Sequence, residues 1–163
     1  MKKNTGKAFL NDDIRASEEK YRSLFDGSRD ALMTLAPPLW RFTSGNPAAL
    51  ALFGAKTGRE FEACTPGDLS PERQPDGRLS AEKAREMIAG AMREGSNFFE
   101  WTHKRLSGGE FPATVLLTRV EVAGNVFLQA TVRDIREMMN KCGDIILISF
   151  EISIMSPHLR QVI

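Results

Sequence analysis

The chain has 163 residues, enough for one domain with a hydrophobic core and too few for two full domains. Hydrophobic residues make up 42% and charged residues 26%, which is typical of soluble globular proteins and excludes collagen-like and disordered chains. A formal net charge of +1 provides no strong field to attract nucleic acid. We therefore expect one folded module and no nucleic-acid partner.

Cysteine usage and hydropathy narrow the class further. Cys64 and Cys142 lie far apart and form no C-x-x-C pair, so neither a metal site nor a disulfide framework is predicted. The longest apolar run, 145–155, contains Glu151 and falls short of the roughly 20 residues of a membrane helix. No apolar signal-peptide segment follows the basic N-terminus. These features predict a cytoplasmic protein without a membrane span.

An amphipathic helix is predicted from about residue 12 to residue 26, because apolar side chains recur at spacings of three and four. The apolar stripe is narrow, as in a coiled-coil seam. The helix therefore either packs on its own domain or forms the seam of a dimer. The seam candidates, which begin just before this helix and follow its spacing, are Leu10, Ile14, Tyr21 and Leu24.

Two short strands and a short helix are predicted next. Segments 31–35 and 40–43 are apolar and flank the turn 36–39, whose two prolines cannot join a strand ladder. Asn46, followed by a proline, is predicted to cap a helix of one or two turns. Residues 55–79 mix turn residues with isolated apolar ones, which predicts short helical turns and loop.

A longer helix and three strands complete the predicted layout. Residues 80–95 have apolar positions at helical spacing, with Ser80 as the expected N-cap. Segments 97–106, 111–122 and 126–135 are rich in β-branched and aromatic residues and are separated by short glycine-containing turns. These segments predict an antiparallel meander, and hence an α+β fold with helices on one face of a sheet.

Three stretches within this order of elements resemble the PAS domain, the sensor module of bacterial histidine kinases, diguanylate cyclases and chemoreceptors. They are Gly45–Ala49, Phe99–Arg105 with Gly109–Pro112, and Val132–Ile135. The resemblance implies a flanking segment at 1–17, a PAS domain at 18–136 and a C-terminal tail at 137–163. In that tail, residues 145–150 have the β-propensity of an extra strand.

The PAS resemblance implies a five-stranded antiparallel sheet in the order 2-1-5-4-3, with helices enclosing a small cavity on its inner face. Alternation along the strands predicts that Trp101 lies on this core face, whereas Leu116 and Phe127 lie on the outer face. In PAS domains the N-terminal helix often covers the outer face and pairs with a second copy. We therefore expect a homodimer with Leu116 and Phe127 in its interface; burial under the chain's own helix is the alternative.

A pocket for a small ligand is implied by the same resemblance, and an ordinary core is the alternative interpretation. The candidate pocket residues are Asn46, Phe53, Phe61, Met87, Ala91, Trp101, Leu117 and Leu128. Asn46 already has a structural role as a helix cap.

The sequence does not favour the cofactors of known PAS domains, so any ligand is unknown. The Asn-Cys-Arg-Phe-Leu-Gln run of covalent flavin binders is absent, and Val132 stands where they have glutamine. The long helix lacks the histidine common in haem binders; a lone strand residue such as His103 is more often exposed or hydrogen-bonded than a ligand. His103 also lacks a placed nucleophile partner, so no enzyme is expected.

The Asp134-Ile135 pair resembles the start of the Asp-Ile-Thr motif through which PAS domains act on a following helix, although Arg136 replaces the threonine. The resemblance implies a sensory or regulatory module that senses a small ligand or partner and transmits through dimer geometry. Its output would be a histidine kinase, cyclase or other domain in a longer or separate chain. The alternative function is a ligand-free interaction or dimerisation module.

Overall fold

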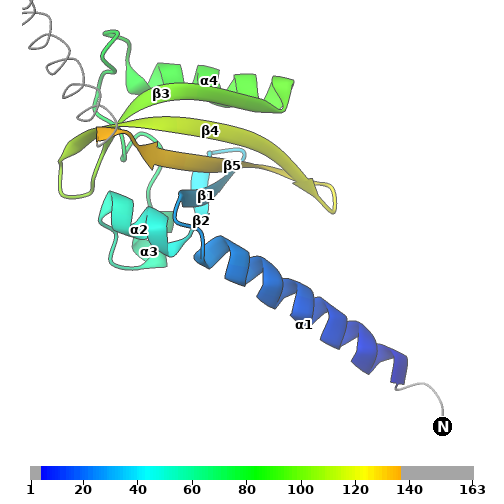
Figure 1. Ribbon diagram of the computed structural model, residues 1–163. Coiled ribbons are helices and arrows are strands. Elements are labelled where there is room, and N and C mark those ends of the chain that lie inside the picture. The colour runs from blue at the N-terminus through cyan, green and yellow to red at the C-terminus, as the bar shows by residue number, and fades with distance from the viewer. Residues whose placement is uncertain (1–4, 137–163) are drawn as a thin grey trace, which may run out of the picture.

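The computed structural model describes residues 5–136, and their side chains from residue 12 onward. The described part begins with a long helix, α1 (Thr5–Asp26), and continues into an α+β domain (Figure 1). The elements of this domain are β1 (Ala31–Ala36), β2 (Arg41–Gly45), α2 (Pro47–Phe53), α3 (Gly58–Glu62), α4 (Ser80–Glu94), β3 (Ser96–Lys104), β4 (Glu110–Val122) and β5 (Asn125–Asp134). The strand-like segment 145–150 and Cys142 lie outside the described residues.

The five strands form one antiparallel sheet in the order β2-β1-β5-β4-β3, which confirms the predicted order. Its register aligns core residues across neighbouring strands. Phe99 of β3 is opposite Val115 of β4, which is opposite Val132 of β5, which in turn is opposite Ala31 of β1. Because side chains alternate along a strand, this register gives the sheet one continuous apolar face.

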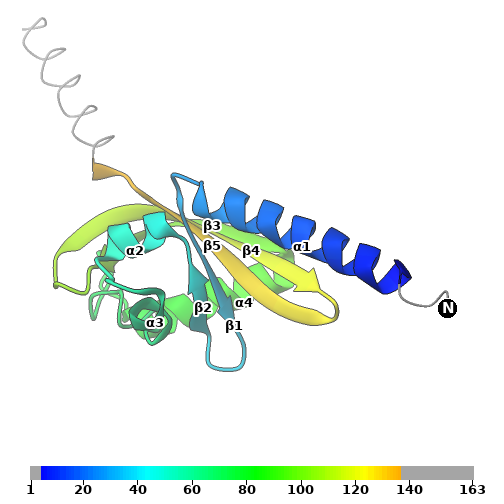
Figure 2. The ribbon, with the colours of Figure 1, turned by 90° about the horizontal axis from the view of Figure 1, so that it is seen from below.

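Three helices cover that inner face: α2 and α3 contact β1 and β2, while α4 contacts β3 and β4 (Figures 1 and 2). Trp101, Leu117 and Leu128 are buried there, as strand alternation predicts. Phe53 and Phe61 are also fully buried. The core therefore lies between one face of the sheet and the helices.

The two predicted helix caps have different outcomes. Asn46 Oδ1 accepts a hydrogen bond from Ala49 N, so the predicted cap of α2 is confirmed. The prediction of Ser80 as a cap is wrong, because Leu79 occupies that position and Ser80 is already helical. The Ser80 hydroxyl instead accepts a hydrogen bond from the Gln74 amide, so a tertiary contact uses the oxygen that a cap would have used.

Helix α1 extends away from the sheet (Figure 1), and its described side chains are exposed up to Leu24, which is 68% exposed. Ile14 and Tyr21 are exposed as well, whereas the side chain of Leu10 lies outside the described residues. The structure therefore does not show this stripe packed on its own domain. Among the helices of residues 5–136, none is long and apolar enough to cross a membrane.

The outer face of the sheet keeps apolar side chains in contact with solvent. Phe98 is 66% and Leu116 38% exposed, and Phe127 is half-buried. Leu116 is thus not buried beneath the chain's own helix, because α1 turns away from the sheet. Only at one end of this face does α1 come close: Tyr21 and Phe127 line the same surface hollow.

Candidate functional site

A cavity of about 60 Å³ lies in the core between α4 and the inner face of the sheet. It is lined almost entirely by apolar atoms. The lining residues are Met33, Leu35, Phe42, Pro66, Ser70, Ala84, Met87, Ile88, Phe99, Trp101, His103, Val115, Leu117, Ala130 and Val132. Ala84, Met87 and Phe99 are only half-buried, so the cavity wall is thinnest where α4 crosses β3.

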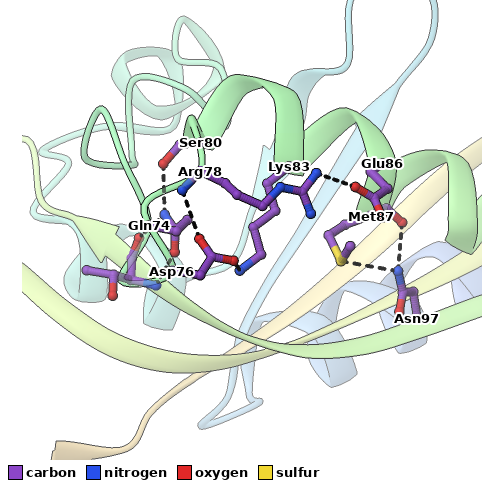
Figure 3. Close-up of polar contacts among 9 residues, drawn as sticks. Gln74, Asp76, Arg78, Ser80, Lys83, Glu86, Met87 and Asn97 are labelled. Carbon is purple, nitrogen blue, oxygen red and sulfur yellow. Dashed lines mark hydrogen bonds and ion pairs between the residues drawn. The ribbon is translucent and has the colours of Figure 1, made fainter.

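Hydrogen bonds tie the start and the middle of α4 to β3 (Figure 3). At its N-terminal end, Gln74 Nε2 donates to Ser80 Oγ (2.8 Å) and to the Thr102 carbonyl (3.1 Å), while Gln74 Oε1 accepts from Thr102 N (2.8 Å). At the middle of the helix, Asn97 Nδ2 donates to the Met87 carbonyl (3.0 Å). The helix that covers the cavity is therefore positioned by polar contacts at its first residue and at Met87.

Charged pairs on the surface reinforce the same helix (Figure 3). Lys83 Nζ lies 2.8 Å from Asp76 Oδ2, and Arg78 pairs with Glu86. The hydrogen bond from Lys83 holds the pKa of the Asp76 carboxyl below its ordinary value. Exposed pairs of this kind contribute little to stability, so the buried Gln74 bonds matter more for the position of α4.

The polar groups in the cavity wall are few. Trp101 Nε1 donates to Ser70 Oγ (2.9 Å), and Ser70 Oγ donates to the Pro66 carbonyl (2.7 Å). His103 Nδ1 lies 3.1 Å from the Leu69 carbonyl oxygen. Among the described residues, His103 Nε2 is the buried side-chain nitrogen or oxygen without a hydrogen-bond partner.

The predicted pocket residues separate into two groups. Met87, Trp101 and Leu117 line the cavity. The others are placed elsewhere in the fold: Asn46, Phe53, Phe61, Ala91 and Leu128. Phe53 and Phe61 pack on each other in the hydrophobic core with ring centroids 5.9 Å apart.

Asn46 is fully buried and has a structural role outside the cavity. Its Oδ1 accepts from the backbone N–H groups of Leu32 (3.0 Å) and Ala49 (2.9 Å). Its Nδ2 donates to the carbonyls of Phe25 and Asp30, both at 3.0 Å. One side chain thus joins the last turn of α1, the start of β1 and the start of α2.

Sequence reasoning missed His103, Phe99 and Ser70 as cavity residues. The alternation that placed Trp101 on the core face also places Phe99 and His103 there, since all three have the same parity on β3. The expectation of an exposed or hydrogen-bonded histidine is met by the hydrogen bond of Nδ1, although Nε2 is buried. No sequence signal marked Ser70, because it lies in a loop.

The cavity is small, and Cys64 lies outside it. A cavity of about 60 Å³ is far below the roughly 300–1,000 Å³ of pockets that hold drug-sized ligands. Cys64 does not line it; its thiol donates to the Glu60 carbonyl (3.3 Å). Burial raises the pKa of this thiol, and the nearby carboxylates of Asp68 and Glu60 raise it further, which makes it a poor nucleophile. Among the side chains of residues 12–136, no group of three or more His, Cys, Asp or Glu lies so that it could hold a metal ion.

The candidate transmission residues lie where β5 ends. The backbone N–H of Ile135 donates to the Pro112 carbonyl (3.1 Å). Asp134 accepts from the backbone and side chain of Arg136 (both 3.0 Å) and lies 3.6 Å from Arg105. Although burial opposes it, the hydrogen bonds from Arg136 hold the pKa of Asp134 below its ordinary value. Arg136, which replaces the threonine of the motif, therefore supplies contacts to the aspartate.

Comparison with known proteins agrees with this architecture. The family model described as the PAS domain matches residues 19–88, from α1 into α4. The sheet order of the whole domain is the one that the PAS resemblance implies. Residues 19–88 match the PAS domain family, and the domain has the PAS fold. None of the curated protein sequences matches it.

Solved PAS domains share the fold at low sequence identity. The PAS domain of an HTR-like protein from Haloarcula marismortui is 18% identical, with a TM-score of 0.64, over 78% of this chain and 98% of that chain. A PAS domain from Colwellia psychrerythraea is 14% identical, with a TM-score of 0.61, over 75% and 98%. A PAS domain from a two-component sensor histidine kinase is 16% identical, with a TM-score of 0.60, over 74% and 97%.

Proposed function

We propose that this PAS domain is a sensory or regulatory module of bacterial signal transduction, which binds a small ligand and transmits the event through dimer geometry. The observation that carries the proposal is the apolar cavity beneath α4, with the half-buried Met87 and Phe99 in its wall. A ligand there would contact both α4 and the sheet, so binding could shift one against the other. The similar fold of a sensor histidine kinase's PAS domain supports this function.

A second function deserves a test because the cavity is small. About 60 Å³ holds a few water molecules or a very small organic molecule. A domain whose core is essentially filled would act as an interaction or dimerisation module without a ligand. The partner in that case would be another protein chain rather than a small molecule.

The proposed dimer uses the two apolar surfaces that the chain leaves exposed. One is the α1 stripe with Ile14, Tyr21 and Leu24, and the other is the outer sheet face with Leu116 and Phe127. In a two-fold dimer each copy presents the same two surfaces. The α1 stripe of one copy could therefore pack on the α1 stripe of the other, next to the outer sheet faces. This arrangement would remove from water the apolar side chains that the single chain exposes.

The proposed output path begins at the end of β5, which lies next to the segment that follows α1. Arg133 of β5 makes a double hydrogen bond with Asp30 (2.8 and 2.6 Å), just after α1, and Asp134 and Ile135 follow directly. A shift of β5 would therefore reach both the flanking helix and the segment after Ile135. The output would lie in a histidine kinase, a cyclase or another domain, in a longer or separate chain.

The proposal includes neither haem nor covalent flavin, and it assigns the domain no catalytic reaction. The small cavity and the position of Cys64 outside it support the first part. The absence of a catalytic reaction from the proposal rests on the cavity wall. There the Trp101 indole and the Ser70 hydroxyl are hydrogen-bonded to other groups, and none of the described hydrogen bonds joins His103 to a nucleophile.

Native mass spectrometry of the full chain purified from its own host, together with a visible absorption spectrum, tests the proposal. A dimer that carries a small extra mass is the expected result. A dimer without any added mass would favour the interaction module instead. A monomer without added mass would contradict transmission through dimer geometry, and a visible chromophore would contradict the proposal that the domain holds neither haem nor flavin.

A further inference from the structure

The cavity beneath α4 presents almost no hydrogen-bonding group to a molecule inside it. The side chains with polar atoms in its wall are Ser70, Trp101 and His103. The Trp101 indole is bonded to Ser70 Oγ, and the Ser70 hydroxyl is bonded to the Pro66 carbonyl. His103 Nδ1 lies 3.1 Å from the Leu69 carbonyl oxygen, and its Nε2 is buried out of reach of a water-sized molecule. The surface that faces the cavity is therefore almost wholly apolar.

This apolar surface disfavours water and polar ligands. A buried water molecule makes about two to four hydrogen bonds, and the lining does not offer such a set of partners. A hydroxyl, amide or charged group that left solvent for the cavity would lose its hydrogen bonds to water without replacement. A molecule without such groups gains from entering, because the transfer of apolar surface from water to an apolar environment is favourable.

The volume of the cavity limits the ligand to a few atoms. An apolar cavity of about 150 Å³ binds benzene, which has six carbon atoms. In proportion, the cavity of about 60 Å³ matches a molecule of about two to four non-hydrogen atoms. A benzene ring is therefore too large, whereas propane has the right size.

The thin part of the wall provides the route by which such a molecule can enter. Ala84, Met87 and Phe99 are half-buried there, between α4 and β3. The Met87 side chain is unbranched and flexible, so it can move while Asn97 holds the Met87 carbonyl (3.0 Å; Figure 3). Entry therefore requires the movement of a side chain and leaves the sheet intact.

We propose that the cavity binds a small apolar molecule without hydrogen-bonding groups, such as a short alkane or alkene. This inference rests on the proposed ligand-sensing function and names the chemical class of the ligand. The bound molecule would contact Met87 on α4 and Trp101 on β3. These are the two elements that a ligand would shift against each other in the proposed function.

Propane and ethanol test this selection on the full chain, because both have three non-hydrogen atoms and only ethanol has a hydroxyl group. Each is titrated while NMR follows the Met87 methyl and Trp101 indole resonances, which report on the cavity. The ring of Phe98, which is 66% exposed, reports on binding to the surface. We expect propane to shift Met87 and Trp101 but not Phe98, and to bind at least about tenfold more tightly than ethanol.

Two variants of α4 show whether the probe occupies the cavity. Ala84 lines the cavity, so Ala84→Leu places three more carbon atoms in it and should abolish the propane shift at Trp101. Ala89→Leu makes the same change at an exposed position of the same helix and should leave propane binding unchanged.

Each outcome bears on the inference differently. An ethanol affinity equal to that of propane, or higher, would overturn the apolar class of ligand while leaving a ligand-binding cavity in place. No binding of either probe would overturn both this inference and the ligand-sensing form of the proposed function. Propane shifts that persist in Ala84→Leu would place the probe outside the cavity and contradict the inference. If Ala84→Leu does not fold, the unmodified chain still decides: propane shifts at Met87 and Trp101 without a shift at Phe98 support the inference, and any other pattern contradicts it.

Discussion

The imidazole Nδ1 of His103 and the carbonyl oxygen of Leu69 lie 3.1 Å apart, and they link β3 to the loop before α4 across 34 positions of sequence. The same carbonyl accepts from the backbone N–H of Lys104 at 2.9 Å. This pair of bonds holds the neutral imidazole against the cavity. It follows that protonation of the ring and stability of the fold are coupled.

Acidification from about pH 7 to about pH 4.5 should lower the free energy of unfolding by up to about 3 kcal/mol through His103. The pKa falls from its ordinary value of 6.5 to about 4 in the folded chain, so the unfolded chain binds the proton first as the pH drops. Urea unfolding across this range measures the effect. The carboxyls with lowered pKa, such as Asp30 and Asp68, lose their contribution only at lower pH.

The variant His103→Gln is the control for this pH dependence, since it removes the titrating ring. Its unfolding free energy should change less over the same range than that of the unmodified chain. Equal pH slopes in the two proteins would show that His103 is not the responsible group.

Trp101→Ala should lower the free energy of unfolding by about 3–5 kcal/mol, because it leaves a void beside the cavity and removes the bond to Ser70. Phe98→Ala is the matched control on the same strand. Phe98 is 66% exposed on the opposite face, so its loss should cost no more than about 0.5 kcal/mol. Chemical denaturation of both variants tests which face of β3 is buried. A small effect of Trp101→Ala would contradict the placement of Trp101 on the core face.

Asn46→Ala should destabilise the chain by about 3 kcal/mol, since it leaves several buried backbone groups without partners. Asn46→Asp should be no milder, because it keeps the acceptor but places a carboxylate oxygen against the carbonyls of Phe25 and Asp30. The exposed Asn125 provides the control, with an expected cost for Asn125→Ala within about 0.5 kcal/mol. A milder Asn46→Asp in thermal unfolding would mean that only the helix cap matters.

Leu24→Glu should reduce the mass in sedimentation experiments from that of a dimer to that of a monomer, because it places a charge in the proposed seam. Arg22→Gln makes the same change in net charge on the opposite side of α1 and should leave the dimer intact. An unchanged mass for Leu24→Glu would contradict the seam. Loss of the dimer in both variants would point to net charge rather than to the stripe.

Much of the fold could be predicted from local patterns. Alternation of apolar and polar residues along β3 to β5 predicted which face of each strand is buried, since a side chain on a strand has only two sides. Asn46 followed by a proline predicted the start of α2, because capping is a contact between near neighbours. Serine is a good capping residue, but the Ser80 hydroxyl accepts a hydrogen bond from Gln74 and does not cap α4.

The site depended on contacts between distant parts of the chain. Hydrophobicity predicted that Phe53 and Trp101 are buried, but only the packing of the helices on the sheet decided that Trp101 borders a cavity and Phe53 does not. The direction of α1 was likewise set outside its own sequence, by the bond of the Phe25 carbonyl to Asn46. Local composition therefore determined the elements and their buried faces, since these depend on near neighbours. The cavity, the partner of His103 and the exposure of the α1 stripe arise only once distant segments are packed together.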